Sequence, residues 1–274
     1  MHMIQVLKLI LLMLLMGSGS FNSSAKIGLC KDDSPNNADI DFQKNFTGTI
    51  NGKLNVVFQI ENKGGVVSGF YYYVSKGVDI KLAGTMAGQQ LDLYELDHSN
   101  NKTASMIGEL KNSVFTGIWQ SLASNKSFPV SLKETKSKVI PLPTNIEGTY
   151  KTQVNDSTDS SPCEVAVKIT KNKDAYFYEL KTESHNYKGN VTFNRDMDAN
   201  ELYITLKGIK WSEYSGDKSN PNKKVKTEKP KDSMSDVEGV YSENEITIQN
   251  DGNAMNSYNV LGECDRKYIR LVKE

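Results

Sequence analysis

The chain has 274 residues, and its 33 lysine and arginine residues are balanced by 33 aspartate and glutamate residues. This balance gives no general reason to expect nucleic-acid binding. Hydrophobic residues make up 38% of the chain and aromatic residues 9%. Tyrosine and phenylalanine supply enough burial area to exclude a fully disordered chain. At about 100–200 residues per domain, the length allows one or two domains.

The N-terminal segment, residues 1–25, has the pattern of a secretory signal peptide. Its apolar run LILLMLLM is followed by the small polar residues GSGS. A membrane-spanning helix needs about 20 apolar residues, so this run is too short to be one. We expect cleavage after Ser20 or Ala25 and an exported mature protein, periplasmic or extracellular, without a transmembrane segment. An uncleaved N-terminal anchor is the alternative.

After a polar leader at residues 26–39, one strand-like pattern recurs, in which a glycine is flanked at two residues' distance by apolar residues. Its copies are centred on Gly48, Gly69, Gly84, Gly108, Gly117, Gly148, Gly189 and Gly239, with a degenerate copy at Gly208. Side chains of a strand alternate between its faces, so the glycine shares the apolar face. Glycine weakens a strand. We expect it here because strands coil tightly around a closed or strongly bent sheet, where a side chain would collide.

Turn signals separate these segments, among them Asn51-Gly52, Lys63-Gly64-Gly65, Lys76-Gly77 and Ala87-Gly88. Short strands with glycine turns at this spacing are typical of antiparallel all-β structure. The sequence therefore predicts an all-β fold built from small barrels or strongly bent sheets.

Two prolines interrupt the pattern within residues 134–145, and it restarts at IEGTY. We therefore predict two antiparallel β modules, at 40–133 and 146–274, joined by this proline-containing linker. A single larger barrel is the alternative. Within the second module, residues 215–236 are rich in Lys, Asn and Pro, a composition that predicts an exposed loop.

Export would place the cysteines, Cys30, Cys163 and Cys264, in an oxidising compartment where two of them can pair. The sequence leaves the pairing open. We favour Cys163 with Cys264, because both lie in strand-like segments of the second module. Cys30 would then be free or bonded to another molecule. The cysteines and histidines lack the close spacing of a zinc site, so we expect no metal and no cofactor.

The segment GTINGKLNVVFQIENKGGVVSGFYYYVSKGVDIKLAGTMAGQQLDLYEL, with the later FTGIWQS and SFPVSL, resembles a β-module found in exported bacterial proteins of largely uncharacterised function. The shared order is G-T-I-x-G-K, then V-x-G-x-Y-Y-Y, I-x-L-x-G, L-x-L-x-E and F-x-G-x-W. Similar modules are described as lipocalin-like. The resemblance covers the first half only. It implies a fold and a bacterial origin, and it carries no catalytic residue across.

The densest polar cluster, Glu95 with Asp97 and His98, has residue types that serve acid–base chemistry or metal binding. It precedes the loop-like Ser99-Asn100, and we interpret it as a solvated turn. Nucleophile and phosphate-binding motifs are absent from the sequence. We therefore expect no catalytic residues and no enzyme, although carboxylates of a hydrolase that converge only in the fold remain an alternative.

The aromatic residues are the stronger candidates for binding. Consecutive tyrosines on one strand point to both of its faces, so one set packs in the core and the other lines a cavity or the surface. The candidate ligand or partner face comprises Tyr71, Tyr72, Tyr73, Trp119, Tyr176, Tyr178 and Trp211. A second candidate is the basic loop of Lys223, Lys224, Lys226, Lys229 and Lys231, which suits an anionic surface or is simply solvated.

These observations favour an exported, non-enzymatic binding protein of the bacterial cell envelope, whose β modules hold a small apolar or amphipathic ligand. The alternative is a periplasmic protein-interaction module, such as an inhibitor or an immunity protein. Such a module would act through the tyrosine face or the basic loop. The expected partner is thus a small amphipathic ligand or an envelope protein, and not a nucleic acid.

Overall fold

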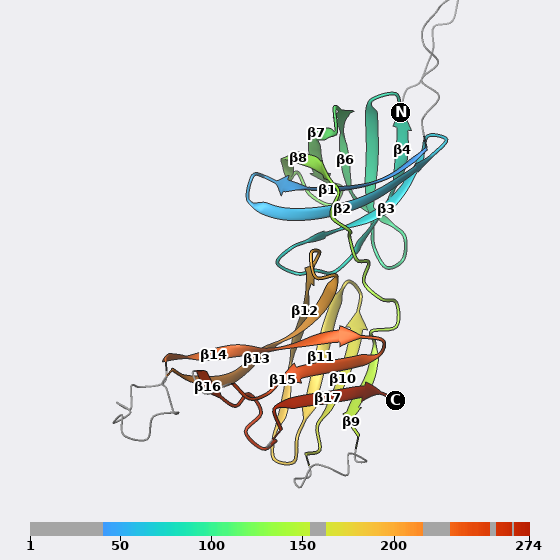
Figure 1. Cartoon of the computed structure of the whole chain (residues 1–274). Helices are drawn as coiled ribbons and strands as arrows, with labels where there is room; N and C mark the ends of the chain where they lie inside the picture. Colours follow the sequence, from blue (N-terminus) through green and yellow to red (C-terminus); the bar gives the residue numbers. More distant parts are fainter. Residues whose placement is uncertain (1–40, 154–162, 216–230, 253–255, 265) are drawn as a thin grey trace, which may run out of the picture. The chain divides into compact units, whose positions relative to one another are not determined.

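The computed structural model describes residues 41–153, 163–215, 231–252, 256–264 and 266–274. Throughout these residues the regular elements are β-strands, arranged in two closed antiparallel barrels (Figure 1). The prediction of an all-β protein with two antiparallel modules is confirmed. The signal peptide, the polar leader and Cys30 lie outside the described residues. No helix in the described part of the chain has the length and apolar character needed to cross a membrane.

The first barrel is an up-and-down meander in which each strand pairs with the next, and β8 returns to pair with β1. Among the described residues its strands are β1 (Phe42–Ile50), β2 (Leu54–Lys63), β3 (Val66–Tyr73), β4 (Ile80–Ala87), β5 (Gln90–Leu96), β6 (Lys102–Lys111), β7 (Val114–Ser121) and β8 (Ser127–Thr135). The closing pair aligns Gly48 of β1 with Leu132 of β8. Closure leaves the barrel without a free sheet edge.

The second barrel follows the same up-and-down order. It closes through the pairing of β9 with β17, while the short β16 adds to β13. Its described strands are β9 (Gly148–Thr152), β10 (Ala166–Asn172), β11 (Ala175–Lys181), β12 (Asn186–Asp196), β13 (Glu201–Ser215), β14 (Lys231–Ser242), β15 (Glu245–Gln249), β16 (Asn256–Tyr258) and β17 (Tyr268–Lys273).

The expected exposed loop at 215–236 is shorter than the sequence suggested. Strand β13 extends to Ser215 and β14 already begins at Lys231, with Glu213 paired to Lys231 in the register. Backbone pairing with a neighbouring strand thus overrides the weak strand propensity of the KDSMSD segment. Residues 216–230, which include Lys223, Lys224, Lys226 and Lys229, lie outside the described residues.

Tight turns join neighbouring strands, and one of them lies at Asn51-Gly52, where the sequence predicted it. Asn51 and Gly52 have φ angles of 57° and 62° between β1 and β2, which is the left-handed pair of a type I′ hairpin turn. Asn112 and Ser113, with φ angles of 51° and 64°, make the same kind of turn between β6 and β7, although serine is an unusual residue there. Such turns match the right-handed twist of the strands that they join.

The strand glycines of the first barrel lie where neighbouring strands approach closely. A Cβ atom built on Gly48 would overlap the carbonyl oxygen of Ser131, and one built on Gly84 would overlap the carbonyl oxygen of Asp92. The expectation that a side chain would collide there is confirmed. It does not hold at Gly208, the degenerate copy, where no atom lies within 4 Å of an added Cβ.

Each barrel encloses its own apolar core. In the first barrel the fully buried side chains include Phe46, Phe58, Tyr71, Leu93 and Phe115. The core of the second barrel contains, among others, Ile146, Tyr150, Val167, Tyr176, Tyr178, Leu180, Phe193, Ile204, Ile248, Ile269 and Leu271. Alternate residues of each strand enter these cores, as the two-residue period of a strand requires.

A smaller apolar cluster forms on the outer side of β2 and β3, where Val57 and Tyr72 are buried with Val139 of the segment after β8. Next to it, the fully buried side chain of Arg195 donates a 2.6 Å hydrogen bond to Asp79 and lies 3.8 Å from the ring centroid of Tyr72. A buried guanidinium is stable when it is paired in this way with a carboxylate and an aromatic face.

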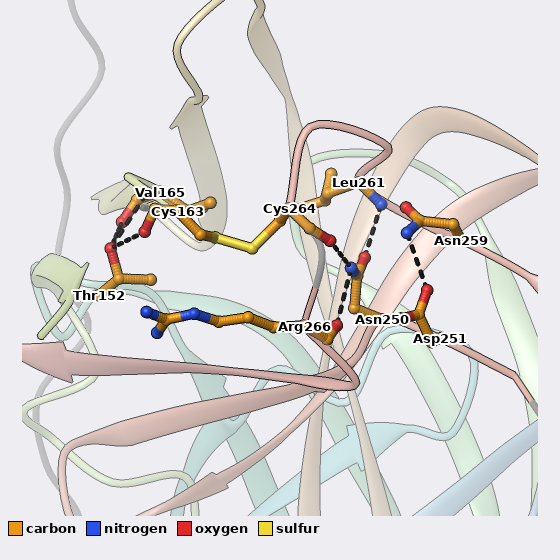
Figure 2. The surroundings of a disulfide bond; sticks show 9 residues. All are labelled: Thr152, Cys163, Val165, Asn250, Asp251, Asn259, Leu261, Cys264 and Arg266. Carbon is orange, nitrogen blue, oxygen red and sulfur yellow. Dashed lines mark hydrogen bonds between the residues drawn. A yellow bond between two sulfur atoms is a disulfide. The ribbon is translucent and has the colours of Figure 1, made fainter. Parts of the chain in front are cut away.

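Cys163 and Cys264 form a disulfide in the second barrel (Figure 2), which is the pairing that the sequence analysis favoured. The neighbouring Asn250 is fully buried, and its amide nitrogen donates to the carbonyl oxygens of Cys264 and Arg266. Its Oδ1 accepts from the backbone N–H of Leu261 at 2.7 Å (Figure 2). The disulfide and this asparagine together hold the loop before β17 against the barrel.

Candidate functional site

One end of the first barrel gathers a polar cluster with an aromatic border. Strands β3, β5 and β7 all finish at this end and β8 begins there. The cluster consists of Tyr71 and Tyr73 from β3, Glu95 from β5, Trp119 from β7 and Phe128 from β8. The alternation of each strand turns these side chains inward. We refer to these five residues as the barrel-end cluster.

Glu95 is the centre of the barrel-end cluster. Its side chain is on the same face of β5 as Leu91 and Leu93, and the residue is only 8% exposed. The hydroxyl of Tyr71 donates a 2.5 Å hydrogen bond to Oε1 of Glu95, and the indole Nε1 of Trp119 donates to the same oxygen. Neither of these bonds uses Oε2. A carboxyl group is thus held inside a barrel whose other buried side chains are almost entirely apolar.

Aromatic rings surround this carboxyl group. Trp119 stacks on Phe128, with ring centroids 5.7 Å apart and an interplanar angle of 19°. Tyr73 meets Tyr71 edge-on, with a centroid distance of 5.5 Å. Tyr73, Trp119 and Phe128 are only partly buried, so the cluster passes from the sealed core to the barrel surface. Aromatic residues with a polar atom suit such a boundary between apolar and wet surroundings.

The electrostatics of the cluster keep its tyrosines neutral. Burial, followed by the nearby charge of Glu95, raises the pKa of Tyr71 far above its ordinary value. Burial also raises the pKa of Tyr73. Both hydroxyls therefore keep their protons at neutral pH and act as hydrogen-bond donors or acceptors.

The prediction that Glu95 lies with Asp97 and His98 in a solvated turn is wrong for Glu95, which is buried in β5. Asp97 does form such a turn, accepting hydrogen bonds from the backbone N–H groups of Ser99 and Asn101 at 2.8 Å. Glu95 belongs instead to the preceding strand. The alternation L-D-L-Y-E-L places it in phase with two buried leucines, and this phase is the signal that could have identified it.

The candidate aromatic face is divided in the structure. Tyr71, Tyr73 and Trp119 meet in the barrel-end cluster, while Tyr72 points to the opposite side of β3 and is buried with Val57 and Val139. The opposite directions of Tyr71 and Tyr72 agree with the sequence analysis. Phe128, which the sequence analysis did not select, completes the cluster.

The remaining aromatic candidates lie in the second barrel. Tyr176 and Tyr178 are buried in its core, and the hydroxyl of Tyr178 donates to the carbonyl oxygen of Lys207 at 2.8 Å. Trp211 packs against Tyr258 and donates its Nε1 hydrogen to the carbonyl oxygen of Asp236. These contacts are those of packed core and strand residues, and Tyr178 also lines a hollow on the second barrel.

The second barrel also presents a shallow hollow of about 450 Å³ on the outer side of β10, β11 and β12. Phe177, 38% exposed, lies in it beside the ion pair of Glu179 and Lys188. This surface is open and combines charged residues, among them Lys168, with polar and aromatic ones. In the described residues no group of three His, Cys, Asp or Glu side chains is placed to hold a metal ion.

His185 takes part in a structural contact rather than a catalytic one. Its ring stacks on Tyr187, and its Nδ1 pairs with Glu263 in the loop that carries Cys264. Hydrogen bonds from Thr182, Ser184 and His185 lower the pKa of Glu263 to about 2. The pair therefore ties the β11–β12 turn to the disulfide loop.

Comparison of the chain with protein families, with curated proteins and with solved structures finds no match in any of the three. The lipocalin-like resemblance of the first half therefore remains a prediction.

Proposed function

We propose that the protein is an exported, non-enzymatic binding protein of the bacterial cell envelope. Its first barrel holds a small amphipathic ligand at the barrel-end cluster. The observation that carries this proposal is Glu95, a carboxyl group that lies within the barrel beside the partly buried rings of Tyr73, Trp119 and Phe128. A mostly apolar site with a few convergent polar atoms is the usual form of a small-molecule site.

Two further observations support the proposal. The neutral, strongly held hydroxyl of Tyr71 favours binding over acid–base catalysis. The Cys163–Cys264 disulfide suits a protein that matures in an oxidising compartment, in agreement with the signal peptide expected at residues 1–25.

Native mass spectrometry of the protein isolated gently from its own envelope fraction tests the proposal. We expect an added mass of small-molecule size that disappears on denaturation. The matched variants are Trp119→Ala, which removes a ring of the cluster, and Ile118→Ala, which alters the neighbouring exposed residue of the same strand. The first variant should lose the added mass, and the second should retain it.

A bare protein, or an added mass that survives Trp119→Ala, would contradict the proposed function. A stoichiometric protein adduct would instead identify the protein-interaction module that the sequence analysis kept as its alternative. In that case the exposed Phe177 would be the first position to substitute, because it is the large apolar side chain of the hollow on the second barrel.

A further inference from the structure

Glu95 has hydrogen-bond donors around it but no cation. Both of its side-chain hydrogen bonds come from neutral groups, Tyr71 and Trp119. Within the described residues no salt bridge includes Glu95, whereas other carboxylates of the first barrel, such as Glu134 with Lys44, have a lysine partner. Burying a carboxylate is costly unless a charge of opposite sign compensates it.

The lysines nearest in sequence do not fill this role. Lys81 lies near the start of β4, which pairs with β5, and its Nζ donates to Asn100 at 2.8 Å. Lys102, at the start of β6, places its Nζ 3.5 Å from the ring centroid of Tyr94. Tyr94 neighbours Glu95 on β5, so its side chain points to the other face of the sheet. Neither of these lysines therefore supplies a positive charge to Glu95.

The aromatic rings of the barrel-end cluster also favour a positively charged group next to Glu95. An ammonium group is attracted to the face of an aromatic ring, most strongly to that of tryptophan, and more so where water is excluded. Trp119, Phe128 and Tyr73 are partly buried beside the carboxyl group. A carboxylate with aromatic rings next to it matches the charge and the shape of an amine head group.

We infer that the ligand of the first barrel carries a cationic amine, which Glu95 binds with its charge and which the rings of Trp119, Phe128 and Tyr73 surround. This inference rests on the proposed function, because it names the chemical class of the ligand for the same site. It assigns Glu95 the role of the residue that selects a cation over a neutral or an anionic amphiphile.

Isothermal titration calorimetry of the full chain tests the inference with probes of matched alkyl length. The probes are decyltrimethylammonium, decylamine, decanol and decanoate, each kept below its micelle concentration. We expect both cations to bind about tenfold or more tightly than decanol, the difference that about 1.4 kcal/mol produces. Decanoate should bind most weakly, because Glu95 repels it.

Two variants locate the selectivity. Glu95→Gln keeps the shape of the side chain and an oxygen acceptor for Tyr71 and Trp119, but removes the charge. It should reduce the affinity for both cations to that for decanol and leave the affinity for decanol unchanged. Glu109→Gln removes a carboxylate from an exposed position on β6, and it should preserve the preference for cations.

The outcomes separate the two claims. If decanol or decanoate binds as tightly as the two cations or more tightly, the amine inference is overturned and the binding function stands. A preference for cations that survives in Glu95→Gln has the same consequence. Failure of all four probes to bind, together with a bare protein in native mass spectrometry, would overturn both. The comparison among ligands uses the unaltered chain, so it remains decisive if Glu95→Gln does not fold.

Discussion

The hydroxyl of Tyr71 lies 2.5 Å from Oε1 of Glu95, inside a barrel whose other deep residues are almost entirely apolar. The two residues lie on strands β3 and β5, which are separated in the sheet by β4. The hydrogen bond therefore crosses the interior of the barrel rather than running along one strand pair. It links the position of the carboxyl group directly to the packing of the core.

Replacing Tyr71 by phenylalanine should destabilise the protein by about 1.5–3 kcal/mol, because it leaves a buried charged acceptor with one donor fewer. The free energy of unfolding in urea provides the measurement. Tyr94→Phe is the matched control, since this half-buried tyrosine of β5 points out of the barrel and phenylalanine keeps its ring contact with Lys102. Equal losses in the two variants would show that the Tyr71 hydroxyl adds nothing.

Replacing Gly84 by alanine should cost more than about 2 kcal/mol, because the new Cβ would overlap the carbonyl oxygen of Asp92 on the neighbouring strand. Gly88→Ala is the control. Gly88 has a left-handed φ of 61° and no atom within 4 Å of an added Cβ, so only the backbone penalty of about 1 kcal/mol applies. Gly84→Ala should therefore have a lower denaturant midpoint than Gly88→Ala. A lower midpoint for Gly88→Ala would contradict the predicted overlap at Gly84.

Removing the disulfide should destabilise the second barrel selectively. Cys163 and Cys264 are separated by 101 residues in the sequence, and the chain-entropy relation gives about 4–5 kcal/mol for a loop of that size. In the Cys163→Ser, Cys264→Ser variant, hydrogen exchange should accelerate in β9, β10 and β17. Exchange in β1–β8 should remain as it was. Acceleration throughout both barrels would contradict this assignment.

Alkaline pH should destabilise the second barrel through Tyr178. Burial, followed by the charge of Asp236, raises the pKa of Tyr178 to about 12. A group whose pKa is higher in the folded state than in the unfolded state stabilises the folded state fully at pH values below its unfolded-state pKa. This stabilisation is lost as the pH rises through its folded-state pKa. We therefore expect a loss of stability between pH values of about 10 and 12 that is smaller in Tyr178→Phe.

Tyrosinate absorbance and the melting temperature, recorded together across that pH range, provide the measurement for Tyr178. Tyr268→Phe is the control, because Tyr268 is 50% exposed. An identical alkaline response in both variants would rule out a specific contribution of Tyr178.

Acid pH should loosen the contact between the β11–β12 turn and the disulfide loop. Glu263 has its pKa lowered to about 2, chiefly by the hydrogen bond from Thr182. A carboxyl group whose pKa is lowered in the folded state stabilises that state at pH values above its unfolded-state pKa of about 4.3. The stabilisation is lost as the pH falls towards 2, the folded-state pKa. Melting temperatures between pH 5 and 2 should fall less steeply in Glu263→Gln than in Glu183→Gln, the control at a neighbouring exposed carboxylate.

The local features of the fold were readable in the sequence because they depend on neighbouring residues. Alternation gave the strands, Asn51-Gly52 gave a hairpin, and the glycine pattern gave the close approach of strands that Gly84 exemplifies. The closing pairs, β1 with β8 and β9 with β17, could not be predicted. They join segments far apart in the chain whose own patterns do not specify a partner.

The candidate site was predicted only in part for the same reason. Tyr71, Tyr73 and Trp119 were selected as aromatic residues, but their meeting with Glu95 depends on the barrel register. Glu95 was grouped with the residues that follow it in sequence, whereas the period of its strand assigns it to the core. Tyr176 and Tyr178 carry the same residue type in the same spacing, yet their barrel surrounds them with apolar side chains.

The tyrosine run of β3 has a consequence for how this strand finds its partners. Tyr71 and Tyr72 are both buried, on opposite faces, so a slip of one residue that moved Tyr72 and Tyr73 into their places would still bring a tyrosine to each. The same slip would bring Phe70 to the place of Gly69, where a Cβ overlaps the carbonyl oxygen of Gln59. The residue without a side chain thus distinguishes the correct alignment from the wrong one, which the tyrosines alone cannot do.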